Sequence, residues 1–282
     1  RSIFIEAGLI KEISTRRIRG VSDAETVDAE GRFAMPGLFD MHAHCASSWT
    51  LSLFPYNGVT FVRDMAAESK WILAARKEIE EGKLLGPRIF THGELIDGPD
   101  SFWKGQSHCI TIRSEEEGAK IVNDLADKGV DAIKFLWQLP PSVFKACVNE
   151  AKKRNLPVSA HVGGFMTVTE AIESGVNSIE HAVTLLGDLI PKDEFQSIVN
   201  ECETDRVFLP SFIGWSRVDV DGEKARKIAQ FVAESRVYFV PTLVVTEKMV
   251  RGNIPFETSE DPNLQYVPER VKQFWSRSSY SR

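Results

Sequence analysis

The sequence of 282 residues has a net charge of −6, and 43% of its residues are hydrophobic. This composition is typical of a globular chain with a large core, and the mildly acidic balance without a basic run argues against nucleic-acid binding. No apolar run approaches the roughly 18 residues of a membrane helix, so we expect no membrane partner.

Four cysteines without a CxxC pattern predict reduced thiols and favour a cytoplasmic location. The chain begins at Arg1 without a methionine. We therefore expect that its natural N-terminus is missing, together with any export signal.

The first segment of the chain shows short alternations of apolar and polar residues. The stretches 3–14 and 26–35 have the pattern of short antiparallel strands. We therefore expect residues 1–34 to belong to a small all-β domain and residues 35–282 to form a second domain.

A helix–glycine–strand pattern recurs in the second domain. It appears in NGVTFVR (57–63), KGVDAIK (128–134) and SGVNSIE (174–180). Ser114 and Glu117 form a capping box at the start of one preceding helix, and Gly129 stands where a helix C-cap requires a positive φ. The pattern predicts βα units with a parallel sheet.

Seven strands are expected in this domain, with helices between most of them, for example at 141–155 and 222–235. The strands are 34–41, 58–65, 87–92, 131–137, 157–162, 177–183 and 237–245. Seven strand–helix units predict an α/β fold of the (β/α)8 TIM-barrel type with one strand unaccounted for. A doubly wound sheet is the alternative, but no GxGxxG follows the first strand.

Five polar side chains stand at or near the ends of apolar strands. His42 and His44 lie two positions apart on one face, where two neutral imidazoles can bind a divalent cation. Lys134, His161 and His181 end later strands at intervals of about one βα unit. A pair of surface or hydrogen-bonded histidines is the alternative for His42 and His44.

Lys134 is placed where a charged amine costs desolvation energy unless it is paired or neutralised. A lowered pKa would make the neutral amine available to react with carbon dioxide. The resulting carbamate is an anionic oxygen ligand that can bridge two metal ions. A snorkelling or salt-bridged lysine is the alternative when the residue is considered alone.

The chain resembles the amidohydrolase superfamily of metal-dependent hydrolases, especially its imidazolonepropionase-like and prolidase-like members. The resemblance is carried by DAEGRFAMPGLFDMHAHC, GVTFVRDM, GPRIF, GVDAIKF, PVSAHVGG, GVNSIEHA and VYFVPTLVV. It implies an incomplete barrel, whose last βα unit is missing, with a partial N-terminal β-sandwich. It also implies two divalent metal ions, most often zinc, bridged by carbamylated Lys134, with His42 and His44 on the first ion and His161 and His181 on the second.

The sequence departs from this superfamily at one position. The superfamily has an aspartate at the end of the eighth strand that binds the first metal and accepts a proton from water. None of the later aspartates ends an apolar strand: Asp188, Asp193, Asp205, Asp219, Asp221 and Asp261. We therefore expect a chain truncated at both ends and inactive by itself, unless a partner chain, a longer gene product or Asp261 completes the site.

Several other residues have both a functional and a structural interpretation. His92 ends the third strand and His108 lies in a loop, and each could contact substrate or only form structural hydrogen bonds. Arg63 and Asp64 could form an ion pair behind the site or at the barrel rim. Glu180 occupies the repeat position of Lys134, so the repeat alone does not decide whether Glu180 or His181 faces inward. Aromatic residues that could line an apolar pocket or pack in the core are Trp49, Trp103 and Trp137.

The resemblance implies hydrolysis of an amide or peptide C–N bond by metal-activated water, with Xaa-Pro dipeptides or N-acyl amino acids as candidate substrates. A mononuclear enzyme of the imidazolonepropionase type, which opens a cyclic amide or deaminates a ring, is an alternative that Lys134 disfavours. A non-catalytic barrel is a further alternative, which the full set of ligand residue types disfavours. The expected partner is a small amide or dipeptide, and a homo-oligomer stays open.

Overall fold

The computed structural model describes residues 1–21, 23–202 and 209–250, together with residues 262, 265, 267–269 and 272. The chain divides into two compact units, Arg1–Pro36 and Gly37–Arg282. The assignment of residues 1–34 to a partial β-sandwich and of residues 35–282 to a barrel stays a prediction.

The first unit contains an antiparallel hairpin of β1 (Ser2–Glu6) and β2 (Leu9–Ser14). Its two-residue loop has positive φ at both positions, which suits the twist of the flanking strands. The strand expected at 26–35 is wrong, because this segment is irregular. The Asp28 side chain accepts a hydrogen bond from the backbone N–H of Glu30 at 2.8 Å. This local bond stabilises a turn, although the alternation of apolar residues predicts a strand.

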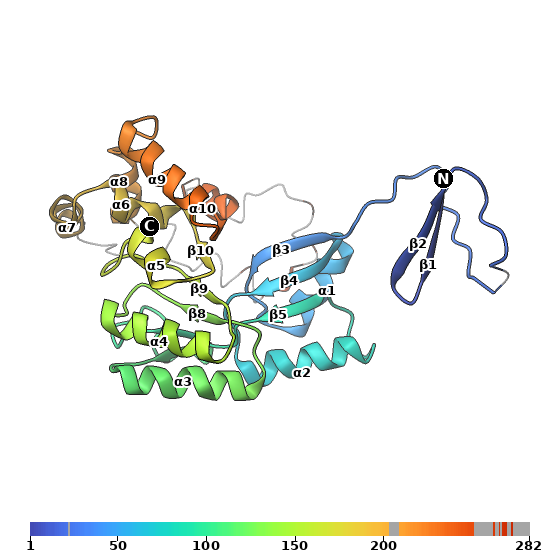
Figure 1. Cartoon of the computed structure of the whole chain (residues 1–282), viewed down its shortest axis with the longest axis horizontal. Helices are drawn as coiled ribbons and strands as arrows, with labels where there is room; N and C mark the ends of the chain where they lie inside the picture. The colour runs from blue at the N-terminus through green and yellow to red at the C-terminus, as the bar shows by residue number, and fades with distance from the viewer. Residues whose placement is uncertain are drawn as a thin grey trace. The chain divides into compact units, whose positions relative to one another are not determined.

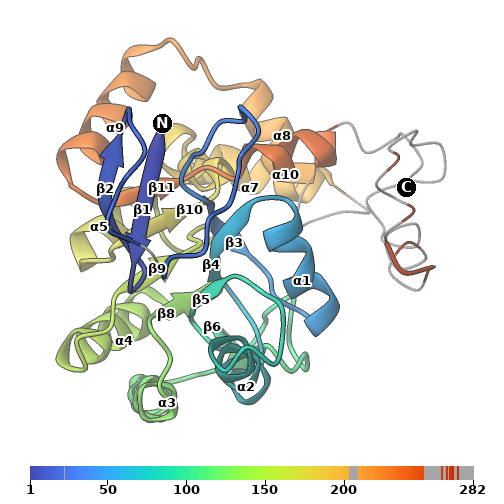
Figure 2. The same ribbon diagram turned by 90° about the vertical axis from the view of Figure 1, so that its right-hand side faces the viewer.

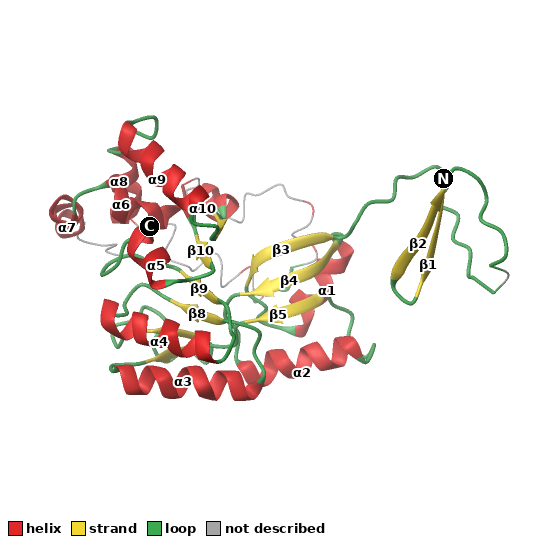
Figure 3. Cartoon of the chain, viewed as in Figure 1, coloured by secondary structure: helices red, strands yellow, loops and turns green. Residues whose placement is uncertain are grey.

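The second unit is built on parallel strands with helices outside them (Figure 1, Figure 3). One sheet pairs β3 (Leu38–Ala43), β4 (Val59–Asp64) and β5 (Arg88–Thr91) in that order. The other has the order β11-β10-β9-β8-β6-β7. Its strands are β6 (Leu95–Asp97), β7 (Cys109–Thr111), β8 (Ile133–Phe135), β9 (Val158–Ala160), β10 (Ser178–Glu180) and β11 (Tyr238–Val240).

The two sheets continue into each other between β5 and β8. The backbone N–H of Asp131, just before β8, donates to the carbonyl of Thr91 at 2.8 Å. The strands β3, β4, β5, β8, β9, β10 and β11 therefore follow one another in chain order, and each overlaps a strand that the sequence predicts. β6 and β7 were not expected. Residues 243–245 are wrongly predicted as strand, because the strand ends before Pro241, which lacks an N–H for the ladder, and a helix follows.

These strands curve around a common axis. From β3 to β10 there are five steps, and a flat sheet would separate these strands by roughly 24 Å. Yet His42 Nδ1 on β3 lies 2.8 Å from Glu180 Oε2 on β10. Figure 2 shows the strands as an arc with helices outside it. No ladder joins β3 to β11 within the described ranges, so barrel closure and the missing unit remain predictions.

The helices alternate with the strands, as the glycine pattern predicts. Gly129 and Gly175 end two of them with φ of 91° and 93°. Ser114 caps the backbone N–H of Glu117, but the Glu117 carboxylate bonds the N–H of Arg113 instead of closing the predicted capping box. The helices are α1 (Ser48–Tyr56), α2 (Ser69–Glu80), α3 (Glu115–Lys128), α4 (Pro141–Lys153), α5 (Val168–Ser174), α6 (Leu186–Leu189), α7 (Lys192–Glu201), α8 (Leu209–Ser216), α9 (Glu223–Glu234) and α10 (Leu243–Val250), with a 3₁₀ turn at Ala182–Leu185. None of the described helices is long and apolar enough to cross a membrane.

Helices α3 and α4 lie side by side and cover the largest core cluster (Figure 1). Their close approach depends on Gly118 in α3, where an added Cβ would overlap the Sγ of buried Cys147 in α4.

Replacement of Gly118 with alanine should therefore lower the free energy of unfolding by about 1–2 kcal/mol. The direct overlap with Cys147 Sγ places the cost of overpacking in the upper part of its range of about 1–3 kcal/mol, and the better helix propensity of alanine returns about 1 kcal/mol. Adding Cys147→Ala should recover part of the loss. Urea unfolding of both variants checks this, and a Gly118→Ala variant at least as stable as the parent would contradict it.

Candidate metal centre

The structure brings the four strand-end histidines together. The ring centroids of His42 and His44 are 5.4 Å apart, those of His42 and His181 are 4.4 Å apart, and those of His161 and His181 are 4.3 Å apart. His42 lies on β3, and His44, His161 and His181 stand just after β3, β9 and β10. Imidazoles from three strands therefore form one cluster at the carboxyl ends of the parallel strands.

The alternation of β3 places the first pair. Ala43 and Cys45 point outward into the core beneath α1 and α2. His42 and His44 therefore share the opposite face. The Asp40 carboxylate accepts a hydrogen bond from the backbone N–H of His42 at 3.0 Å, which holds the strand end in place.

His181 enters the cluster by a break in strand alternation. Its φ of 70° is unusual for a residue other than glycine and costs about 1–3 kcal/mol. Its carbonyl accepts a bond from the Thr184 hydroxyl, and its N–H donates to the carbonyl of Val240. Because of this bend, Glu180 and His181 both face the interior, and the two alternatives left open by the repeat are both realised.

Lys134, on β8, faces the same interior. Its side chain is only 2% exposed, and its Nζ has no hydrogen-bond partner among the described residues. Burial lowers the pKa of Lys134 to about 7, with Glu180 raising it and Arg63 lowering it in part. A large fraction of the amine is therefore neutral near neutral pH.

The histidines are also held neutral. Burial is the main cause that lowers the pKa values of His42, His161 and His181, and the charge of Lys134 lowers each of them further. Neutral imidazole is the form that binds metal ions. Four such rings around a buried unpaired amine are a donor set that fits a zinc-like cation.

The donor atoms are not yet arranged as a complete metal cage. In the part of the chain that the structure describes, no three histidine, cysteine or carboxylate side chains converge in that way. The rings instead pack edge to face or tilted against one another. His42 and His181 are anchored at Nδ1 by Glu180 and Thr242, at 2.8 and 2.7 Å.

A buried ion pair lies behind His42. Arg63 Nη2 is 2.6 Å from Glu180 Oε1, and Glu180 Oε2 faces His42. Burial by itself raises the pKa of Glu180, but the hydrogen bond with His42 and the charges of Lys134 and Arg63 outweigh it and hold that pKa well below its usual range. Glu180 is therefore an ionised carboxylate inside the fold.

A model of the amidohydrolase family matches residues 33–253. The chain belongs to the amidohydrolase family. Members of this family are hydrolases and generally bind divalent metal ions. Ochratoxinase from Aspergillus niger is 26% identical over 207 residues, which cover 52% of this chain and 42% of that protein. The chain thus spans less than half the length of this curated relative.

Solved structures show the same fold. One amidohydrolase is 24% identical with a TM-score of 0.61, and the match covers 89% of this chain and 63% of that one. A prolidase complexed with N-methylphosphonate-L-proline is 20% identical with a TM-score of 0.57, covering 84% and 72% of the two chains. The chain therefore shares its parallel α/β fold with these solved structures.

His92, a candidate substrate contact, is fully buried in the fold. Its Nδ1 lies 2.7 Å from the Asp64 carbonyl and its Nε2 lies 2.8 Å from the Ser159 hydroxyl. Both ring nitrogens thus have protein partners, which favours the structural interpretation of His92.

Burial lowers the pKa of His92 to about 3. The unfolded chain then binds a proton that the folded chain does not bind between about pH 6.5 and 3, so His92 costs stability as the pH falls through this range. From about pH 7.5 to about pH 5 this loss amounts to about 2 kcal/mol. In urea unfolding over the same pH range, the free energy of unfolding of His92→Asn should fall by about 2 kcal/mol less than that of the parent protein. Equal losses in the two proteins would contradict the assignment.

Arg63 and Asp64 do not form the expected ion pair. They are adjacent on β4 and point to opposite faces. Arg63 binds Glu180, whereas the Asp64 carboxylate accepts bonds from the Cys45 N–H at 3.0 Å and the Thr91 hydroxyl at 2.8 Å. Burial raises the pKa of Asp64 to about 6 in spite of these bonds.

His108 and two tryptophans lie near the histidine cluster. The His108 ring is 5.4 Å from Trp103 and is half-buried. Its charge is among those that lower the pKa of His44, after burial and the charges of His42 and Lys134. The Trp137 ring is 4.5 Å from His161. Both tryptophans pack on a small core cluster, and Trp49 lies half-buried in α1.

The described aspartates after His181 belong to caps and turns. Asp188 accepts bonds from the backbone N–H groups of Val168 and Thr169 at the start of α5, and Asp219 accepts one from the N–H of Asp221. Asp193 lies in the first turn of α7. Asp205 and Asp261 lie outside the described residues, so the expected absence of the general-base aspartate stays a prediction.

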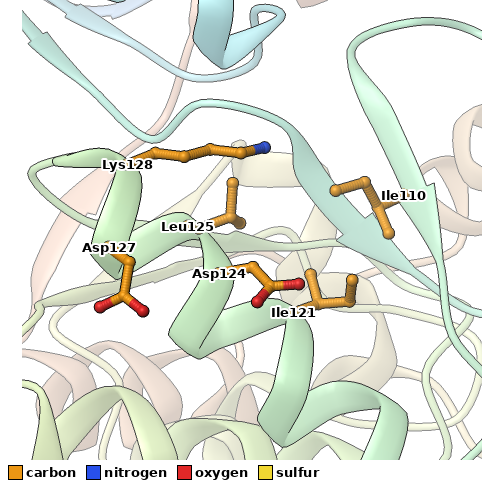
Figure 4. Close-up of a pocket in the computed structure, with 6 residues that line it drawn as sticks. All are labelled: Ile110, Ile121, Asp124, Leu125, Asp127 and Lys128. Atoms are coloured by element: carbon orange, nitrogen blue, oxygen red, sulfur yellow. The ribbon is translucent and has the colours of Figure 1, made fainter.

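A surface cavity of about 360 Å³ lies beside α3 (Figure 4). Its lining is largely aliphatic with two carboxylates, and it contains none of the five strand-end residues. The lining residues are Ile110, Ile121, Asp124, Leu125, Asp127 and Lys128. The cavity is therefore separate from the candidate metal centre.

Proposed function

We propose that this amidohydrolase cleaves the amide or peptide C–N bond of a small molecule with the help of two divalent metal ions. The observation that carries the proposal is the buried, unpaired amine of Lys134 inside a cluster of four histidines. A protein has little reason to bury an amine without a partner unless its neutral form has a use.

Each of the five strand-end residues has a role as a metal ligand in this proposal. His42 and His44 would hold the first ion, and His161 and His181 would hold the second. The neutral Nζ of Lys134 would form an N–C bond with carbon dioxide and release one proton, and the resulting carbamate would supply an anionic oxygen ligand shared by the two ions. Imidazole and anionic oxygen are ligands that zinc accepts readily, so zinc is the metal we propose.

When bound, the ions lower the pKa of water and polarise the scissile carbonyl. The residues of the protein itself would orient the substrate and exclude bulk water from the site. Trp137, in ring contact with His161, offers an apolar wall on which a proline ring or an acyl chain can pack. We therefore propose Xaa-Pro dipeptides and N-acyl amino acids as the first substrate classes to test.

The test uses the full-length protein, purified with its metal. Elemental analysis gives the metal content, and a panel of Xaa-Pro dipeptides, N-acyl amino acids and cyclic amides is assayed before and after chelation. We expect turnover of a linear amide, lost on chelation and restored by zinc. Turnover of cyclic amides alone with a single ion would favour the mononuclear alternative, and metal binding without any turnover would favour a non-catalytic barrel.

A further inference from the structure

The Glu180 carboxylate is shared between three side chains. It is 0% exposed. Its Oε2 lies 2.8 Å from His42 Nδ1, and its Oε1 accepts from Arg63 Nη2 at 2.6 Å and from the Ser178 hydroxyl at 2.7 Å. Both oxygens are thus in use inside the protein.

The contact with His42 determines which ring nitrogen carries the proton. Oε1 already accepts from Arg63 and Ser178, and the guanidinium at 2.6 Å makes Glu180 the anion of a buried ion pair. The carboxylate of such a pair only accepts hydrogen bonds, so His42 carries its hydrogen on Nδ1, which faces Oε2. The lone pair of Nε2 is then free in the neutral ring. Histidines that bind metal ions commonly donate their other N–H to a carboxylate in this way.

Arg63 holds the carboxylate in this position. Its Nε donates to the Met41 carbonyl at 2.7 Å, on the strand that carries His42. Its Nη1 donates to the Ser178 hydroxyl at 3.0 Å, on the strand that carries Glu180. One guanidinium from β4 therefore ties β3 to β10 across the interior and neutralises the buried charge.

The second anchored histidine gives a useful contrast. His181 Nδ1 lies 2.7 Å from the hydroxyl of Thr242. A hydroxyl can donate or accept, so Thr242 leaves the tautomer of His181 open. The carboxylate at His42 leaves no such choice.

We propose that Glu180, held by Arg63, is a positioning residue that fixes His42 in the Nδ1–H tautomer and directs its Nε2 toward the metal. The proposal rests on the metal-dependent function proposed above. Glu180 acts through His42 and is not itself a ligand, because its two oxygens face His42 and the pair of Arg63 and Ser178.

The test replaces Glu180 with glutamine. An amide has one oxygen, which Arg63 and Ser178 take, so its NH₂ group faces His42 Nδ1 and favours the Nε2–H tautomer. We expect metal affinity to fall by about 10–100-fold. The affinity is measured by competition between the full-length protein and a zinc chelator, and circular dichroism verifies the fold. Nitrogen-15 NMR of histidine-labelled, metal-free protein gives the tautomer, with the His42 signals assigned from a His42→Gln variant.

The matched control is Asp131→Asn. Asp131 pairs with Arg76 at 2.8 Å and contacts none of the histidines. Loss of this pair should lower stability but leave the zinc affinity and the His42 tautomer unchanged. Glu180→Asp keeps the charge but shortens the reach, and it should weaken zinc binding without bringing an amide N–H toward His42.

The outcomes separate this proposal from the function on which it rests. A parent protein that binds no zinc would overturn the proposed function. A parent protein that binds zinc, with affinity and tautomer unchanged by Glu180→Gln, would overturn the positioning role. If the glutamine variant does not fold, the parent protein alone decides, because an Nε2–H tautomer of His42 in the metal-free protein overturns the proposal and an Nδ1–H tautomer supports it.

Discussion

Replacement of Lys134 with alanine is expected to reduce the metal content from about two ions per chain to about one, because the proposed carbamate is the ligand that a two-metal site shares. The remaining ion would keep two imidazoles. Loss of the shared ligand should lower turnover by about 10²–10⁴-fold, since bound metal ions contribute several kcal/mol to transition-state stabilisation. Elemental analysis and turnover of the same preparation measure both effects.

Two comparisons make this experiment specific. Lys152→Ala removes an exposed lysine that bonds the carbonyl of Ser174, and it should change neither metal content nor turnover. Formate or acetate added to Lys134→Ala should restore part of both, because a small carboxylate fits the space that the side chain leaves. One ion per chain in the parent protein, unchanged by Lys134→Ala, would rule out the binuclear site.

The strand positions could be predicted because each depends on local residues. Gly58, Gly129 and Gly175 carry the positive φ that reverses the chain, and an apolar stretch follows each of them. The polar residues that follow each apolar stretch indicate where the strand ends. β6 and β7 escaped prediction because no helix precedes either of them, so the alternation of helix and strand does not mark them.

The site could be predicted in its residues but not in its connections. Successive side chains of a strand face opposite sides, so a regular strand lets only one of Glu180 and His181 face inward. The positive φ at His181 breaks this alternation and lets both face inward. The partner of Glu180 lies 138 residues away in sequence, and that of His181 lies 61 residues away. No local pattern encodes such contacts, and so the sequence does not reveal Thr242 as the partner of His181.

The error at Arg63 and Asp64 has the same origin. Opposite charges side by side in the sequence suggest a pair, but neighbours on a strand point to opposite faces. Arg63 faces the interior and meets a carboxylate from another strand. Asp64 faces the other way and binds backbone and hydroxyl groups. Strand geometry, applied strictly, excludes the pair from the sequence alone.

Replacement of His161 with asparagine is expected to remove the second ion and leave the first. His161 contacts His181 and Trp137 with ring centroids 4.3 and 4.5 Å apart. Burial and the neighbouring His181 hold the pKa of His161 well below its usual range, so its imidazole is neutral and available to a cation. With His161 absent, the second ion keeps one imidazole and the shared carbamate, and turnover should fall by about 10²–10⁴-fold.

This loss differs from that of Lys134→Ala in one respect: small carboxylates should not restore it, because the missing ligand is a nitrogen and the shared oxygen ligand is intact. His108→Asn is the matched control, since His108 lies near the cluster but is not one of the five proposed ligands. It should keep both ions, and if His108 contacts substrate, it should raise KM more than it lowers kcat. The measurement is zinc titration of each metal-free variant by calorimetry. Two ions bound by His161→Asn with the affinities of the parent protein would exclude His161 from the metal site.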